Sequence, residues 1–224
     1  MMKLFLIINL IFLALKVGAQ PFQFYDQGKV TYERIEGKSS TKTLYKSDFT
    51  LTFNKSESSF DAVKNNDDHP FRVQNAKLFS ENEDKTGIQL KFSGQNFIIL
   101  DTVKKIKWYY TNEFRLIEGY QCRRIDGLTA DSLYVIAFYT DEIPVSTGPC
   151  LISGTPGLAL GFVIPDYGIQ YWAKDITFRS IKIPSPSSGK AKKITIDDFG
   201  KIIQNSSYNL GNLSIINIIH SIIY

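Results

Sequence analysis

The segment Leu133–Tyr139, LYVIAFY, carries an apolar or aromatic side chain at every position. Successive side chains of a β-strand point to opposite faces of the sheet, so a strand with this sequence is apolar on both faces. Such a strand lies in the middle of a sheet that is covered on both sides, or inside a strongly curved one. The segment therefore predicts a central strand of a covered or curved sheet.

Period-two alternation recurs along most of the chain. Phe49–Phe53 (FTLTF) and Ile88–Phe92 (IQLKF) place their apolar residues on one face only, and Ser93–Asn96 turns the chain into Phe97–Leu100. Asn54–Asp68 is polar and is expected to be a long loop or hairpin end. The count of such segments is about nine to eleven strands. We therefore expect a mainly β protein with a single antiparallel sheet, curved into a partial barrel, which resembles outer-membrane lipoprotein carriers at the level of fold alone.

The C-terminal part of the sequence departs from this pattern. Thr195–Gln204 follows a break rich in serine and proline, and its spacing predicts a short helix with Thr195 as the N-cap. Asn209–Tyr224 fits neither period and contains too many polar residues for a membrane span. The expected organisation is a signal peptide over residues 1–19, a β domain over residues 20–184 and a C-terminal segment over residues 185–224.

The N-terminus predicts export. A basic start precedes the apolar run Leu4–Leu15, and Val17-Gly18-Ala19 supplies the small residues that a signal peptidase accepts. The run is too short to span a membrane, so the mature protein is expected to be periplasmic or secreted and not an integral membrane protein. The formal net charge of +4 is too small to predict a nucleic-acid partner.

One segment concentrates glycine and proline: Gly148–Gly168, GPCLISGTPGLALGFVIPDYG. Proline fixes φ and glycine accepts positive φ, so this segment predicts a rigid loop with tight turns. The loop is interpreted either as a packed connection between strands or as a preformed recognition surface. Its candidate binding residues are Pro144, Gly148, Pro149, Leu151, Ile152, Gly154, Thr155, Pro156, Gly157 and Leu158.

Several motifs around this loop occur together in one known family. They are Gly119-Tyr120-Gln121-Cys122, the segment Phe138–Pro144 (FYTDEIP), Gly148-Pro149, and Gly154–Ala159 (GTPGLA). In order and spacing they resemble the GLPGLI family of exported bacterial proteins. Thr155 and Ala159 stand where the family has Leu and Ile. The family has no established biochemical role, so the resemblance implies an exported protein and no particular reaction.

The two cysteines, Cys122 and Cys150, predict a disulfide, because an exported protein meets an oxidising compartment. If Gly119–Ile125 and Leu133–Tyr139 form a hairpin, Cys122 lies near the end at which the chain enters the loop that carries Cys150. A soft-metal or redox pair is the rival interpretation.

Residues suited to catalysis are scarce. The two histidines are His69, in a polar segment, and His220, which is expected to be partly buried with its polar atoms satisfied. Asp141 and Glu142 alternate sides of a strand end and cannot serve as a carboxylate pair. We therefore expect a non-catalytic protein without a cofactor or metal.

Three hypotheses for function remain open. The first is a binding or chaperone-like protein of the cell envelope that holds an apolar small molecule, a lipid or a protein segment, with the loop at the mouth of a cavity. The second is a structural or assembly partner of an envelope complex that docks through Gly148–Leu158. The third is a metal- or redox-handling protein built on Cys122 and Cys150.

Overall fold

A computed structural model describes residues 25–37, 44–63, 76–81, 85–102, 105–183, 186, 189–206, 220 and 223 of the chain. The predicted signal peptide, His69 and nearly all of the tail from residue 209 lie outside the described residues. The strands are β1 (Gly28–Glu36), β2 (Tyr45–Phe53), β3 (Glu57–Ala62), β4 (Lys77–Glu81), β5 (Lys85–Phe92), β6 (Gln95–Thr102), β7 (Lys107–Ile117), β8 (Tyr120–Leu128), β9 (Tyr134–Thr140), β10 (Leu158–Ile164), β11 (Ile169–Thr177) and β12 (Lys192–Thr195).

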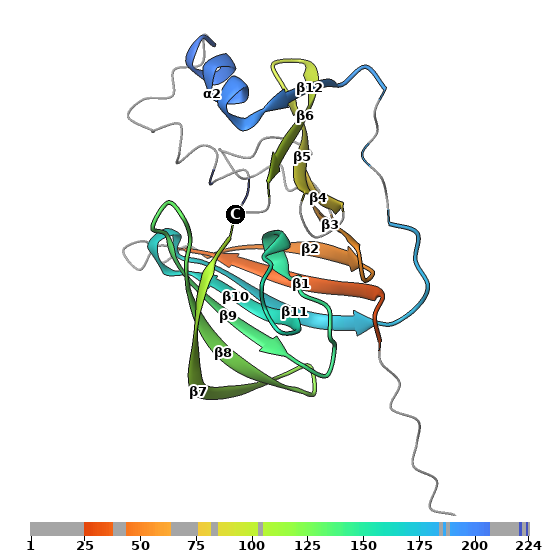
Figure 1. Ribbon diagram of the computed structural model, residues 1–224, viewed down its shortest axis with the longest axis vertical. Coiled ribbons are helices and arrows are strands. Elements are labelled where there is room, and N and C mark those ends of the chain that lie inside the picture. The colour runs from red at the N-terminus through yellow and green to blue at the C-terminus, as the bar shows by residue number, and fades with distance from the viewer. Residues whose placement is uncertain are drawn as a thin grey trace, which may run out of the picture.

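All twelve strands belong to one open sheet, in the order β12-β6-β5-β4-β3-β2-β1-β11-β10-β9-β8-β7. The chain makes two antiparallel meanders, β1 to β6 and β7 to β11, which join where β1 pairs with β11. The pairing of β12 with β6 is parallel. In Figure 1 the strands β7 to β11, β1 and β2 curve into a half-barrel, and β3 to β6 with β12 turn away as an arm. The prediction of a mainly β, curved, mostly antiparallel sheet is confirmed.

The segment that is apolar on both faces forms an interior strand, as predicted. β9 pairs with β8 on one side and with β10 on the other. Val135 and Ala137 are buried, and Phe138 on the opposite face packs against Trp172 with ring centroids 5.4 Å apart. Gly161 makes this contact possible, because a Cβ atom there would lie 2.5 Å from the Trp172 ring.

An aromatic cluster joins the half-barrel to β3, the first strand of the arm. Phe60 packs against Tyr32, Phe49 and Tyr171, with ring centroids 6.2, 5.1 and 5.7 Å away. Tyr32 is fully buried, and its hydroxyl donates to the Ala159 carbonyl oxygen at 2.7 Å. Edge-to-face and stacked rings of this kind add to the free energy gained from burying their area. The cluster therefore ties β1, β2, β3, β10 and β11 into one core.

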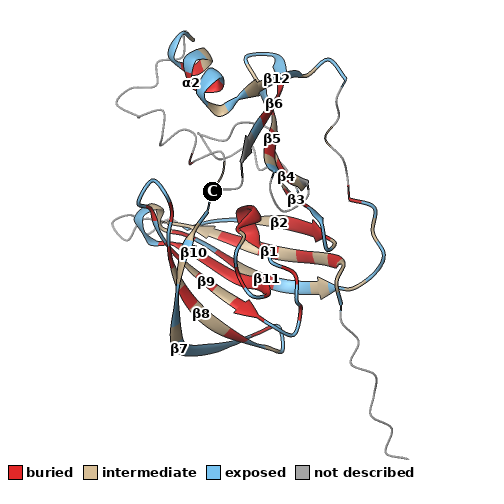
Figure 2. Ribbon diagram, viewed as in Figure 1, coloured by how far each residue is buried: buried red, intermediate tan, exposed pale blue. Residues whose placement is uncertain are grey.

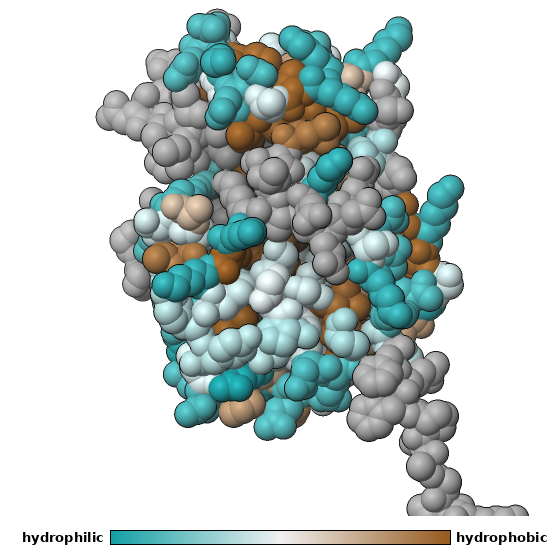
Figure 3. Space-filling model, viewed as in Figure 1, coloured by the Kyte–Doolittle hydropathy of each residue, from teal (hydrophilic) through white to brown (hydrophobic). Residues whose placement is uncertain are grey.

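The C-terminal helix α2 (Ile196–Gln204) is confirmed with the predicted N-cap. The Thr195 Oγ1 accepts a hydrogen bond from the Asp198 amide at 3.1 Å. Phe199 is fully buried and contacts the rings of Phe92 and Phe97, at centroid distances of 5.6 and 5.8 Å. The helix thereby packs on the arm, where apolar side chains also gather on the face shown in Figure 3. Within the described ranges, no helix has the length and apolar character needed to cross a membrane.

His220 of the C-terminal tail contacts the half-barrel. The His220 Nε2 lies 2.6 Å from Asp131 Oδ2, and Nδ1 lies 2.5 Å from the Tyr167 hydroxyl. Because a carboxylate only accepts, Nε2 carries the proton and Nδ1 accepts from Tyr167. His220 is 5% exposed, so the expectation of a buried and satisfied histidine is confirmed.

Candidate functional site

The glycine- and proline-rich segment forms a folded loop, residues 141–157, between β9 and β10. Its short 3-10 helix η1 (Pro149–Leu151) lies in the hollow of the half-barrel and is buried (Figure 2). The amide of Leu158 donates to the Ile143 carbonyl at 2.9 Å, and the amide of Ala159 donates to the Thr147 carbonyl at 2.9 Å. The Trp108 Nε1 donates to the Ser153 carbonyl at 2.9 Å, which fixes the loop to β7.

Most of the predicted binding residues in this loop are buried. Pro144, Gly154 and Pro156 are exposed. The seven buried ones are Gly148, Pro149, Leu151, Ile152, Thr155, Gly157 and Leu158. The loop therefore fills the concave side of the half-barrel with its own apolar side chains, where the sequence had suggested the mouth of an apolar cavity.

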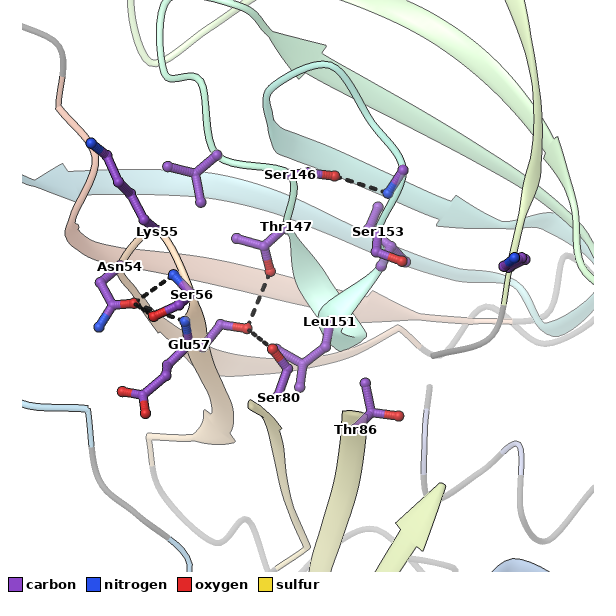
Figure 4. A pocket seen from close by; sticks show the side chains of 15 residues that line it. Asn54, Lys55, Ser56, Glu57, Ser80, Thr86, Ser146, Thr147, Leu151 and Ser153 are labelled. Carbon is purple, nitrogen blue, oxygen red and sulfur yellow. Dashed lines mark hydrogen bonds between the residues drawn. The ribbon is translucent and has the colours of Figure 1, made fainter. Parts of the chain in front are cut away.

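A pocket of about 550 Å³ lies beside the loop, where the half-barrel meets the arm (Figure 4). Its walls come from the β2–β3 turn, the facing ends of β3, β4 and β5, Lys105 just before β7, and the loop itself. The lining residues are Asn54, Lys55, Ser56, Glu57, Ser58, Ser80, Thr86, Lys105, Val145, Ser146, Thr147, Leu151, Ile152, Ser153 and Gly154. Pockets of this size hold small molecules or single chain segments.

The floor of the pocket is a row of hydroxyl groups. The Thr147 Oγ1 lies 3.4 Å from Ser58 Oγ, which lies 3.2 Å from Ser80 Oγ. Ser58 and Thr147 are 4% and 6% exposed. The row links the loop to β3 and β4, as the dashed lines in Figure 4 show. Since a hydroxyl both donates and accepts, this floor can meet either kind of polar group on a ligand.

The rim of the pocket is held in place by local hydrogen bonds. The Asn54 Oδ1 accepts from the amides of Ser56 and Glu57 at 2.8 and 2.7 Å, which fixes the β2–β3 turn. On the opposite side, the Ser146 Oγ accepts from the Gly154 amide at 2.9 Å. Both sides of the rim are therefore preformed.

The pocket was not predicted from the sequence, because Asn54–Asp68 was expected to be a long loop or hairpin end. Glu57–Ala62 is strand β3, and its Ser58 and Ser59 side chains are buried. Buried hydroxyls interrupt the alternation of apolar and polar residues, and Phe60 alone marks the buried face. The signal that could have found the strand is its pairing with the clean alternating strand β2.

The predicted disulfide between Cys122 and Cys150 is wrong, since both are free thiols in the structure. Each thiol has its own partner: Cys122 Sγ lies 3.6 Å from the Tyr120 carbonyl oxygen, and Cys150 hydrogen-bonds Tyr171. Burial raises the pKa of each thiol to about 12. Both stay protonated at neutral pH, whereas metal binding and nucleophilic attack need the thiolate. Among the described residues no group of three or more His, Cys, Asp or Glu is arranged to hold a metal ion.

A buried cation supports the loop from behind. Arg34 is 8% exposed, and its guanidinium binds Glu36 at 2.5 Å and the Tyr171 hydroxyl at 3.1 Å. Tyr171 in turn hydrogen-bonds the Cys150 thiol, and its burial raises its pKa well above the usual value. Glu36 thus compensates the charge that Arg34 carries into the core, and the neutral Tyr171 hydroxyl accepts a hydrogen bond from its guanidinium. Arg34 was not predicted from the sequence as a buried residue, although it lies on the same face of β1 as Val30 and Tyr32.

The residues considered for catalysis do not come together. Asp141 and Glu142 are exposed at the start of the loop, on the turn that follows β9. His220 is engaged by Tyr167 and by Asp131, which lies in the turn of the β8–β9 hairpin. The pocket thus contains none of Asp141, Glu142 and His220, and its lining offers hydroxyls, an amide, two lysines and one glutamate.

The fold and the pocket define a curved, open-sheet β protein with a preformed pocket of ligand size. No family model and no curated protein matches the chain. Among solved structures it is similar to PNGF-II, in two crystal forms, with a TM-score of 0.59 and 17% and 16% identity over 80% of this chain. The chain spans 33% of the PNGF-II chain. At this identity the likeness concerns the fold alone.

Two further solved structures have lower TM-scores. A LolA superfamily protein from Nitrosomonas europaea has a TM-score of 0.36 and 6% identity, over 70% of this chain and 88% of that one. A putative outer membrane lipoprotein-sorting protein domain from Vibrio parahaemolyticus has a TM-score of 0.32 and 8% identity, over 81% and 92%. Scores this low do not bear on function.

Proposed function

We propose that this protein is an exported, non-catalytic binding protein of the cell envelope, and that its ligand site is the pocket between the loop and the arm. The observation that carries the proposal is the preformed pocket of about 550 Å³. Export rests on the N-terminal signal sequence and on the resemblance of the loop motifs to the exported GLPGLI family.

The lining of the pocket favours an amphipathic ligand. Val145, Leu151 and Ile152 contribute an apolar wall, and the hydroxyl row of Thr147, Ser58 and Ser80 contributes a polar floor. A lipid, or a protein segment with one apolar side chain, would place its apolar part on the wall and its polar part on the floor. The ligand is still expected to have an apolar part, but its site is the pocket and not the concave face, which the loop fills.

The test is native mass spectrometry of the full chain after secretion, followed by solvent extraction of whatever remains bound. Thr86 lies on β5 at the pocket, so Thr86→Phe fills the site with a ring. Thr177→Phe, on an exposed position of β11, is the matched control. We expect about one bound molecule per protein in the wild type and in Thr177→Phe, and none in Thr86→Phe. A bare wild-type protein, or a Thr86→Phe variant that melts normally and keeps the ligand, would overturn the proposal.

The alternative, an assembly partner that docks through Gly148–Leu158, has less support. The apolar residues of that loop, Leu151 and Ile152, are 8% and 4% exposed and line the pocket, so they form no outward surface on which a partner protein could dock. The interpretation as a metal or redox protein is also disfavoured, because burial keeps the thiols of Cys122 and Cys150 protonated.

A further inference from the structure

The strand β7 forms one edge of the sheet, and among the described strands only β8 is its hydrogen-bonded neighbour. Figure 1 shows it along the free side of the half-barrel. An edge strand presents backbone amides and carbonyls that can pair with another chain.

Exposed apolar side chains gather on this edge. Tyr109, Tyr110, Phe114 and Leu116 of β7 are 51%, 57%, 57% and 73% exposed. They are four of the eleven large hydrophobic side chains that are exposed in the described part of the chain, and two more, Leu128 and Tyr134, lie on the neighbouring strands β8 and β9. A concentration of this kind marks an interaction surface more often than chance exposure does.

Positive charges on the same edge are held by aromatic rings. Lys107 lies over Tyr109 at 5.2 Å from the ring centroid, and Arg123 lies over Tyr110 at 5.4 Å. Arg115 lies over Trp172 of β11 at 4.2 Å. Cation–π contacts fix the direction of a cation and leave its charge uncompensated.

Two carboxylates near this edge, Glu113 and Asp126, are already engaged by one arginine. Arg124 binds Glu113 and Asp126, each at 2.8 Å. None of the ion pairs found among the described residues involves Lys107, Arg115 or Arg123. The positive charges of Lys107 and Arg115 therefore lie on one face of β7, and that of Arg123, on the neighbouring strand β8, lies on the other face with Tyr110 and Phe114.

A bulge limits how much of β7 can pair with another strand. The register with β8 shifts between Tyr110 and Phe114, so residues 111–113 lie opposite Arg124. The Arg123 Nε donates to the Thr111 carbonyl at 2.7 Å, and Thr111 Oγ1 donates to the Arg124 carbonyl at 2.9 Å. The bulge leaves two straight stretches, residues 107–110 and 114–117. Bulges on edges prevent indiscriminate pairing between sheets and still admit a short added strand.

We propose that β7 is the docking edge for an extended, acidic segment of a partner protein. The segment adds to the sheet as a short strand. Its carboxylates lie against Lys107 and Arg115 on one face, and its apolar residues lie against Tyr110 and Phe114 on the other face. A second copy of this chain is a poor occupant, because it brings the same three positive charges and its Glu113 is already paired with Arg124. Like charges that face each other across paired strands are destabilising.

The test uses fluorescently labelled synthetic peptides and the full chain. One peptide alternates Glu and Val over eight residues, the second alternates Lys and Val, and a thymidine oligonucleotide is the competitor. We expect the Glu-Val peptide to bind with an affinity that falls as salt is raised, and the Lys-Val peptide not to bind. Hydrogen exchange should slow in residues 107–117 when the Glu-Val peptide is bound, because the added strand protects edge amides.

Charge-reversal variants locate the site. Lys107→Glu with Arg115→Glu should weaken binding of the Glu-Val peptide by about tenfold or more. The matched control is Lys182→Glu with Lys190→Glu, two exposed lysines outside the strands, which changes the net charge equally and should leave the binding almost unchanged. Equal weakening in both variants, binding without slower exchange in β7, displacement by the oligonucleotide, or dimers of the protein in sedimentation would each overturn the proposal.

Discussion

Replacing Gly157 by alanine should destabilise the protein more than any other single methyl addition in the loop. A Cβ atom at this position would lie 2.0 Å from the Thr140 carbonyl oxygen and 3.0 Å from the Asp141 Cα. Ordinary van der Waals contact begins at 3.4 Å, so the loop and the end of β9 must separate by about 1.4 Å at this point. Both contacting groups are backbone, and no side chain can rotate away to relieve the clash.

The size of the effect follows from two costs. Overpacking that shifts the backbone costs about 1–3 kcal/mol. The shift also strains the hydrogen bond from the Leu158 amide to the Ile143 carbonyl, which contributes about 1 kcal/mol. The free energy of unfolding should therefore fall by about 2–4 kcal/mol, a large part of the 5–15 kcal/mol typical of a folded domain.

Urea unfolding measures this loss directly. With a slope of about 2 kcal/mol per molar urea, the midpoint should fall by about 1–2 M. Gly189→Ala is the matched control, because nothing lies within 4 Å of its added Cβ. If Gly157→Ala unfolds within about 0.5 kcal/mol of the wild type, the loop is not packed against β9 as described.

Three further predictions test the surroundings of the loop. Without reductant, a thiol reagent should modify neither cysteine in the native protein and both Cys122 and Cys150 in denaturant; a protein with no reactive thiols would contradict the free-thiol assignment. Stability should fall as the pH rises above 9, because the folded state keeps the Cys150 proton up to a pKa of about 12 while the unfolded state loses it near 9. By pH 10 this group accounts for about 1.4 kcal/mol, and Cys150→Ala should lose that part of the pH dependence, as pH-resolved urea melts would show. Trp108→Phe removes the hydrogen bond to the Ser153 carbonyl and should cost about 1 kcal/mol, with faster amide exchange in the loop; unchanged exchange would show that Trp108 does not hold the loop.

The parts of the fold that the sequence predicts are those in which local pattern and tertiary structure agree. Leu133–Tyr139 is apolar on both faces, which indicates an interior strand, and β9 is paired on both sides, with Val135 and Ala137 buried and Ile136 and Phe138 half-buried on the opposite face. The helix at Ile196–Gln204 begins at an N-cap threonine with an apolar stripe behind it, so capping and periodicity give the same boundary. A segment can be predicted from sequence alone when its local pattern and its tertiary packing favour the same structure.

The parts that the sequence does not predict depend on contacts between distant segments. Ser58 reads as polar loop sequence, but in the fold it is a buried hydroxyl that meets Thr147 and Ser80. A disulfide between Cys122 and Cys150 was predicted because an exported protein meets an oxidising compartment. In the fold, Tyr120 and Tyr171 give each thiol a separate partner. The pocket escaped prediction for the same reason, since its walls come from four separate stretches of the chain.

The pairing of β1 with β11, which joins the two meanders, can form only after β11 has been synthesised. Glu36 of β1 pairs with Ile169 of β11, 133 residues further along the chain. At a synthesis rate of about 5–20 residues per second, β1 waits roughly 7–27 s for this partner. Until then the β1 to β6 meander presents an open edge that carries Val30 and Tyr32, which belong in the core. A chain interrupted before β11 would keep that edge open, so late truncations should produce aggregating fragments even when most of the sheet has been made.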